Sequence, residues 1–173
     1  MNHYPPLGVI KDDRVIIKKN LMKIPKSLPQ FEKKPLLFLI SGEFEAEFYV
    51  AKNGRIYKSG SFVLNPREEA KEKQAFVGKK GGMQSLSAVS HHGRYIQNLK
   101  EKFLKKMSET VDDISDREKI TEISIFSPTY AENRILKKLS KKAREKVAYT
   151  HKGHFVKENP IRFIEMIQPE SAK

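Results

Sequence analysis

The chain has 173 residues and a formal net charge of +13, with 34 lysines and arginines against 21 aspartates and glutamates. It contains no cysteine, which excludes disulfides, cysteine zinc sites and thiol nucleophiles together. So basic a chain predicts a polyanionic partner, namely RNA, DNA or an anionic membrane surface, although a solvated lysine-rich surface would have the same composition. The sequence has neither a secretory signal nor an apolar run able to cross a bilayer, so we expect a soluble cytoplasmic protein.

The N-terminal part of the chain predicts little regular structure. Residues 1–34 are irregular and contain four prolines. Within them, only Arg14–Lys19 has the composition of a strand, and it could pair with Leu7–Ile10 as a hairpin. We therefore expect an N-terminal arm or a small hairpin over residues 1–34, followed by a single α/β domain over residues 35–173.

Three strands are predicted at the start of this domain. Leu36–Ser41 is a continuous apolar run, as in a buried central strand. Glu43–Ala51 alternates, with three glutamates on one face and apolar side chains on the other. Asn53–Gly54 is a strong hairpin-turn signal, and Arg55–Leu64 continues after it. This pattern predicts a three-stranded antiparallel meander.

A polar, glycine-containing segment follows at residues 65–85 and predicts a mobile loop, within which Arg67–Gln74 could form a short helix. Apolar residues then recur at helical spacing and predict an amphipathic helix over about residues 85–110. Its other face carries Arg94 and several lysines. The acidic stretch Asp112–Glu118 is predicted to be a connector.

The last third of the chain alternates strands with helices. The predicted elements are a strand at Glu122–Ser127, a helix from Thr129 to about Ala143, a strand at Lys146–His151 and a short helix at Ile161–Ile167. Glu132 would form a capping box with Thr129, and Asn159 with Pro160 would start the last helix. Strands that alternate with helices should be parallel, through right-handed crossovers. The predicted class is therefore α/β: a mixed five-stranded sheet, an antiparallel β-meander followed by α-β-α-β-α, in a ribonuclease H-like arrangement.

The stretch GKKGGMQS at residues 78–85 lies just before the predicted long helix. Together with LLFLISGEFEAEFYVAKNGRI and the block Ile120–Ile167, it resembles the middle domain of archaeal and eukaryotic peptide-chain release factors. The chain is still more similar to bacterial relatives of that domain, which include the host attachment protein family. The resemblance covers residues 35–168.

In release factors this loop reaches the peptidyl-transferase centre. There the backbone N–H of a glutamine, helped by its side chain, supports attack of water on the peptidyl-tRNA ester. The resemblance implies the same catalytic roles for Gly81, Gly82 and Gln84, and the glutamine is matched when Met83 is counted as an insertion. Glycines let the backbone approach RNA closely, and a backbone N–H can stabilise a developing oxyanion.

The resemblance also implies a translation-associated protein that binds the ribosome, rRNA or tRNA. Rescue of stalled ribosomes without codon reading fits a chain of this length, which has no room for a decoding domain. The residues expected to contact phosphates are Lys79, Lys80, Arg94, Lys137, Lys138, Lys141 and Lys142. The basic stretch at residues 139–146 has a second interpretation, as the solvent face and C-terminal end of a helix. No cofactor is expected.

Two alternative functions remain open. The host attachment label suggests a non-catalytic interaction protein with a protein partner. Glu43, Glu45 and Glu47 share one strand face and could hold Mg²⁺ in a nuclease, but a solvated, charged sheet face explains them as well.

The histidines and one tyrosine also have two interpretations each. His91, His92, His151 and His154 could suggest a metal, but surface histidines in a basic region explain them better, and no metal site is predicted. Tyr95 could stack on a base or pack against the sheet.

Overall fold

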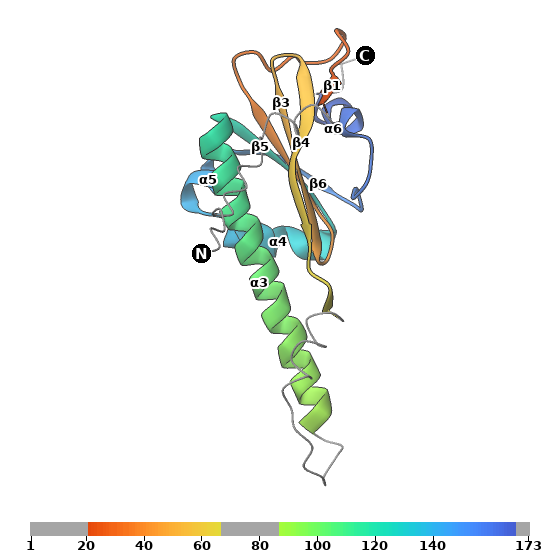
Figure 1. The fold of residues 1–173 in the computed structure, drawn as a ribbon, viewed down its shortest axis with the longest axis vertical. Helices are drawn as coiled ribbons and strands as arrows, with labels where there is room; N and C mark the ends of the chain where they lie inside the picture. The colour runs from red at the N-terminus through yellow and green to blue at the C-terminus, as the bar shows by residue number, and fades with distance from the viewer. Residues whose placement is uncertain (1–20, 67–86, 169–173) are drawn as a thin grey trace, which may run out of the picture.

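Six strands form one mixed sheet at the centre of the protein (Figure 1). The computed structural model describes residues 21–66 and 87–168, with the side chains of the long helix described from Gly93 onward. The strands are β1 (Leu21–Lys23), β2 (Leu36–Ser41), β3 (Glu45–Lys52), β4 (Arg55–Val63), β5 (Glu122–Ser127) and β6 (Val147–Lys152). The helices are α3 (Ser87–Glu118), α4 (Thr129–Lys138), α5 (Lys141–Glu145) and α6 (Pro160–Ile167). The predicted mixed α/β fold is confirmed.

The predicted number of five strands is wrong, because β1 adds a sixth strand to the edge of the meander. Leu21 of β1 pairs with Tyr57 of β4 in antiparallel register. Ile24, just after β1, is fully buried and donates its N–H to the carbonyl of Gly54 at 2.9 Å. A strand of three residues is too short to show alternation in the sequence, so only its hydrogen bonds reveal it.

The strand order is β1-β4-β3-β2-β5-β6. β2, β3 and β4 form the predicted antiparallel meander, whereas β2, β5 and β6 run parallel. The turn between β3 and β4 has positive φ at both Asn53 and Gly54, 51° and 71°, as in a type I′ hairpin turn. The sequence signal for this hairpin is confirmed.

Both faces of the sheet are buried. On one face, alternate side chains of β2, β3 and β5 pack against α3, α4 and α5. On the other face, Phe38 and Phe126 pack against Phe163 of α6, and Ile24, Leu28 and Phe31 cover the same layer. Figure 1 shows α3 and α6 on opposite sides of the sheet. A sheet covered on both sides needs apolar residues at successive positions, which explains why β2 is apolar almost throughout.

Helix α3 runs to Glu118, so the predicted connector is wrong and the acidic stretch is helical. Val111 and Ile114 are buried against the sheet and extend the apolar stripe through the acidic residues. The helix ends at Lys119, which takes a left-handed φ of 57°. The N–H of Ile120 then bonds back to a carbonyl five residues earlier, at 3.0 Å, as in a Schellman motif.

The single helix predicted after β5 is divided into α4 and α5 at Leu139 and Ser140. Ser140 caps α5, because its Oγ accepts the N–H of Ala143 at 3.1 Å. The same hydroxyl donates to Asp112 of α3 at 2.7 Å. This contact holds the break between the two helices against α3.

Two predicted helix starts have different outcomes. The capping box at α4 is wrong: Pro128 is the N-cap, and Glu132 pairs with Lys152 of β6 at 3.6 Å. The start of α6 is confirmed, because the side chain of Asn159 accepts a backbone N–H of the first turn at 3.0 Å and Pro160 follows it.

Replacing Phe163 by alanine is expected to lower the free energy of unfolding by about 3–5 kcal/mol. The ring is fully buried, with its centroid 4.9 Å from that of Phe126 and 6.1 Å from that of Phe38, so the change leaves a cavity under α6. Urea denaturation followed by circular dichroism measures the loss. Arg162→Ala removes only an exposed ion pair and should cost less than about 1 kcal/mol. Equal losses in the two variants would contradict the described packing of α6.

Candidate nucleic-acid interface

Helix α3 is much longer than the sheet it covers. Its 32 residues span about 48 Å, whereas the nine residues of β4, the longest strand in the described part of the chain, span about 30 Å. Along the described side chains of α3, the first fully buried one is Leu99. Figure 1 shows the preceding part of the helix extending past the end of the sheet. The protein therefore has an arm made of a single helix.

The predicted catalytic residues Gly81, Gly82 and Gln84 lie outside the described residues, as do Lys79 and Lys80. The same holds for the possible short helix at residues 67–74 and the possible hairpin at residues 7–19. What the structure does describe is where the predicted loop joins the domain.

The segment that contains the predicted loop is attached to the arm at both ends. It follows Pro66, whose carbonyl accepts the hydroxyl of Tyr95 on α3 at 2.9 Å. It ends where α3 begins, at Ser87, eight residues before Tyr95 and thus about 12 Å along the helix axis. The side chain of Tyr95 is therefore half-buried and makes a structural hydrogen bond, which favours packing over base stacking for this residue.

The charge of α3 changes sign along its length. Residues 93–106 carry five cations and one carboxylate, a net charge of +4, whereas residues 107–118 carry one cation and five carboxylates, a net charge of −4. The cations of the first part are Arg94, Lys100, Lys102, Lys105 and Lys106. The basic half is the one that leads into the arm, so positive charge is concentrated toward the end that carries the predicted loop.

The predicted lysines of α4 and α5 lie beside α3, and all four are exposed. Lys138 pairs with Glu101 at 3.1 Å and Lys142 pairs with Asp116. The hydrogen bond and charge of Lys142 hold the pKa of Asp116 below its usual value, and the same contact raises the pKa of Lys142. Two of the four lysines thus compensate acids of α3.

Three of the predicted cations form no ion pair with a described acid. Arg94, Lys137 and Lys141 are exposed and make no ion pair with any residue of the described ranges. Lys138 lies next to Glu101, which is seven residues beyond Arg94 on α3, or about 10 Å. Lys138 therefore lies on the same side of α3 as Arg94.

Arg134 is a cation of this surface that the sequence analysis missed. It is exposed on α4, one turn before Lys138, and neighbours at this spacing share a helix face. That spacing could have identified it. Within the basic stretch 139–146, Arg144 has a different role. Its guanidinium donates hydrogen bonds to the carbonyls of Lys137 and Leu139 at 3.2 and 3.1 Å, and it thereby provides partners for the backbone carbonyls at the C-terminal end of α4.

The three glutamates near β3 do not share one solvated face. Glu47 is buried, with only 4% of its surface exposed. It accepts hydrogen bonds from Nζ of Lys58 at 2.6 Å and from the N–H of Lys157 at 3.1 Å. Burial and this nearby carboxylate raise the pKa of Tyr49 to about 12. These contacts occupy the oxygens of Glu47, and no group of three acids or histidines in the described ranges could hold a metal ion.

The described histidines differ in environment, while the side chains of His91 and His92 lie outside the described part. His154 is exposed, as a surface histidine would be. His151 is half-buried and stacks on Phe126, with ring centroids 4.5 Å apart. Burial lowers the pKa of His151, and its buried Nε2 has no hydrogen-bond partner among the described residues. The surface interpretation is therefore wrong for His151.

His151 is expected to make the protein less stable in mild acid. Its pKa is lowered in the folded state, so below an ordinary histidine pKa of about 6.5 the unfolded chain takes up a proton that the folded chain does not. The free energy of unfolding should therefore be highest above that pH and fall as the pH decreases. Urea titrations between pH 7.5 and 5 measure the slope, which His151→Phe should reduce and His154→Asn should leave unchanged. If the slope is unchanged in His151→Phe, the loss of stability in acid does not come from protonation of His151.

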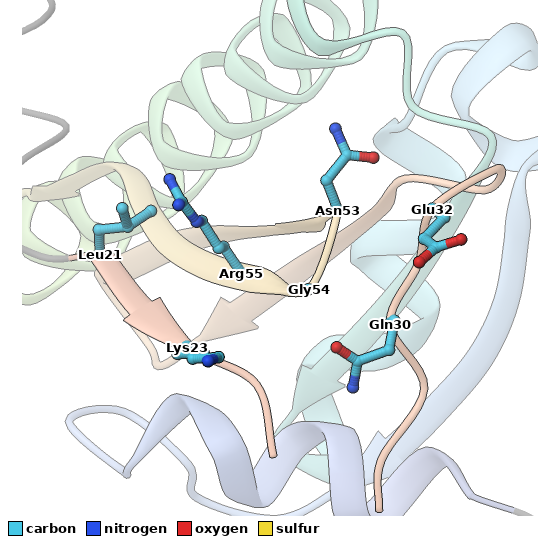
Figure 2. Close-up of a pocket in the computed structure, with 7 residues that line it drawn as sticks. All are labelled: Leu21, Lys23, Gln30, Glu32, Asn53, Gly54 and Arg55. Atoms are coloured by element: carbon cyan, nitrogen blue, oxygen red, sulfur yellow. The ribbon is translucent and has the colours of Figure 1, made fainter. Parts of the chain in front are cut away.

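An open hollow lies at the β3–β4 turn, far from the arm. Its open volume is about 850 Å³, and Figure 2 shows its lining side chains coming from β1, the segment after it and the turn. Gln30 holds this region together: its Nε2 donates to two carbonyls, and its own carbonyl accepts the N–H of Gly54 at 2.6 Å. None of the predicted site residues lies there.

Within the described ranges, no helix has the length and apolar character needed to cross a membrane. No known protein family matches the sequence, and no curated protein matches it either.

Similarity to known proteins is found in structure. The crystal structure of the archaeal translation termination factor aRF1 superposes with a TM-score of 0.50 and 11% sequence identity. The match covers 79% of this chain and 35% of that factor, so the chain spans about a third of its length. A second structure, described only as an archaeal protein, gives a TM-score of 0.43 at 11% identity over 69% of this chain and 30% of its own. The chain therefore has a release-factor-like α/β fold.

Proposed function

We propose that this protein acts in translation, by binding stalled ribosomes and hydrolysing the peptidyl-tRNA ester. The observation that carries the proposal is the helical arm of α3, which extends beyond the sheet (Figure 1). The predicted Gly81–Gln84 loop comes shortly before Ser87, the first residue of this helix, in the sequence. The similarity of the fold to that of an archaeal translation termination factor also supports a role in translation. A helical arm of this kind suits a protein that must deliver a loop into a narrow RNA-lined site.

The basic surface supplies the binding step in this proposal. Arg94, Lys137 and Lys141 would contact phosphates of rRNA or tRNA, because their charges are not compensated by described acids. At the acceptor end of the tRNA, the backbone N–H of Gln84 would stabilise the oxyanion that forms as water attacks the ester carbonyl. The ester bond breaks, and the tRNA hydroxyl leaves with the proton that water supplies.

The proposal is limited to ester hydrolysis without codon reading. The structural match spans 35% of the archaeal factor, so the activities of the rest of that factor are not carried over. Rescue of ribosomes stalled without a stop codon needs only the binding and hydrolysis steps.

The test is a release assay with the purified chain and stalled ribosome–peptidyl-tRNA complexes. Free peptide is measured over time, and co-sedimentation with ribosomes is measured in parallel. Release above the uncatalysed rate, together with co-sedimentation, would support the proposal. The absence of both would overturn it.

A second candidate is a non-catalytic binding module of the host attachment type. The observation that favours it is Met83, which interrupts the Gly-Gly-Gln order. One added residue can displace a group by about 3.8 Å, and a misplacement of about 1 Å already slows a reaction strongly. The absence of both peptide release and co-sedimentation would favour this candidate, whereas co-sedimentation without release would indicate an RNA-binding module that has lost the chemistry of the loop.

A further inference from the structure

The fold contains a reversal of strand order at one edge of the sheet. From β2 the chain continues to β3 and β4 on one side, and after α3 it continues to β5 and β6 on the other. β2 and β5 are parallel neighbours, so their carboxyl ends, Ser41 and Ser127, lie at the same edge. In open α/β sheets, ligands bind in the crevice at such a point.

A small cavity lies at this edge, between the end of β2, the middle of α3 and the start of α4. Its floor includes the buried side chains of Phe103, Leu104 and Ile135. Its volume is about 30 Å³, which is close to the share of one water molecule in the liquid. A planar ring would therefore cover the cavity from outside and would not enter it.

An exposed aromatic side chain stands at the rim of this cavity. Tyr130, in the first turn of α4, is 58% exposed, the second most exposed of the large apolar side chains in the described ranges. Its hydroxyl has no hydrogen bond to a described residue. A single exposed aromatic ring is common on a protein surface and does not by itself indicate a binding site. Tyr130 indicates one only in combination with the residues around it.

Those neighbours are cations. Arg134 lies one turn after Tyr130 on the same helix, is exposed and makes no ion pair with a described residue. Lys100 of α3 closes the other side and pairs with Glu43 at 3.4 Å. An aromatic platform flanked by arginine and lysine is the combination that binds single-stranded nucleic acid, since the ring stacks on a base and the cations contact phosphates.

We propose that this rim is a binding site for one unpaired nucleotide of RNA. The ring of Tyr130 stacks on the base above the apolar cavity, and Arg134, which makes no ion pair with a described residue, contacts the adjacent phosphate, while Lys100 stays paired with Glu43 at the rim. The choice of RNA as the ligand rests on the proposed function in translation and on the formal charge of +13. None of the residues of this site belongs to the predicted Gly81–Gln84 loop.

The first test uses the absence of tryptophan from the chain. Tyr130→Trp introduces a single fluorescent stacking side chain at the site, and Tyr149→Trp does so on β6 as a control. The probes are a seven-nucleotide oligoadenylate and an abasic oligonucleotide of equal length. Oligoadenylate should quench the fluorescence of Tyr130→Trp only. Equal quenching by the abasic probe, or equal quenching in the Tyr149→Trp control, would overturn base stacking at Tyr130.

The second test measures affinity for oligoadenylate by anisotropy in folded variants checked by circular dichroism. Tyr130→Ala should weaken binding about tenfold, Tyr130→Phe should bind like the wild type, and Tyr149→Ala should have no effect. Arg134→Gln should lower the slope of log affinity against log salt by about one. Wild-type affinity in Tyr130→Ala would reject the site, and a chain that binds no oligonucleotide would point to a protein partner instead.

Failure of this inference can be told apart from failure of the proposed function. Peptide release by the wild type, with oligoadenylate binding unchanged in Tyr130→Ala, would keep the function and reject the site. Base-dependent binding at Tyr130, without release or ribosome co-sedimentation, would keep the site and reject the function.

Discussion

Peptide release is expected to fall by about two orders of magnitude or more when Gln84 is replaced by alanine. The backbone N–H that is proposed to stabilise the oxyanion remains in this variant, so the expected loss is that of the side chain, which is proposed to orient the attacking water. A misplacement of about 1 Å of a reacting group already costs about 10² in rate. Single-turnover release from stalled complexes measures the rate. Gln74→Ala is a matched control, because it removes a second glutamine from the same segment without touching the Gly-Gly motif.

Two further variants make this prediction sharper. Gly82→Ala should also lower release, because a glycine is proposed to allow close approach and an unusual backbone conformation. Deletion of Met83 restores the order Gly-Gly-Gln-Ser and should leave release equal or faster. If Gln84→Ala and Gln74→Ala release peptide at the same rate as the wild type, the side chain of Gln84 has no catalytic role.

Replacing Arg94, Lys137 and Lys141 together by glutamine is expected to weaken RNA binding on the order of 10²-fold at low salt. These three exposed cations make no ion pair with a residue of the described ranges, so each is available to a phosphate. The loss of three contacts should also reduce the slope of log affinity against log salt by about 2. Binding of tRNA or single-stranded RNA, measured at several salt concentrations, tests both numbers.

The control for this experiment removes the same charge from another face. Lys23, Lys26 and Lys33 are exposed and belong to the N-terminal segment, whose apolar residues cover the α6 side of the sheet. Their joint replacement by glutamine lowers the net charge equally but should weaken binding only slightly. Equal losses in the two triple variants would mean that the chain attracts RNA through its overall charge and that α3, α4 and α5 form no specific surface.

Much of the fold could be predicted because its determinants lie close together in the chain. The alternation of β3, the apolar run of β2 and the Asn53–Gly54 turn each act within about ten residues. The parallel strands follow from the alternation of strands and helices, which leaves few topologies. The candidate site is harder to predict from such patterns. The Gly-Gly-Met-Gln stretch is a local motif, but the sequence does not indicate that α3, which follows it, extends beyond the sheet.

The sequence by itself determined the charge, the absence of cysteine chemistry, the order of the main elements and the stretch from which a catalytic loop is predicted. The tertiary structure alone decided that β1 joins the sheet, that the acidic stretch continues α3 and that Glu47 is buried. It also decided that Lys138 and Lys142 pair with acids of α3, and that Tyr130 and Arg134 meet at the strand-order reversal. The physical reason is distance along the chain: Lys157 reaches Glu47 across 110 residues, and Lys138 reaches Glu101 across 37. Local periodicity carries no information about such contacts, because burial and ion pairing depend on which faces the folded sheet brings together.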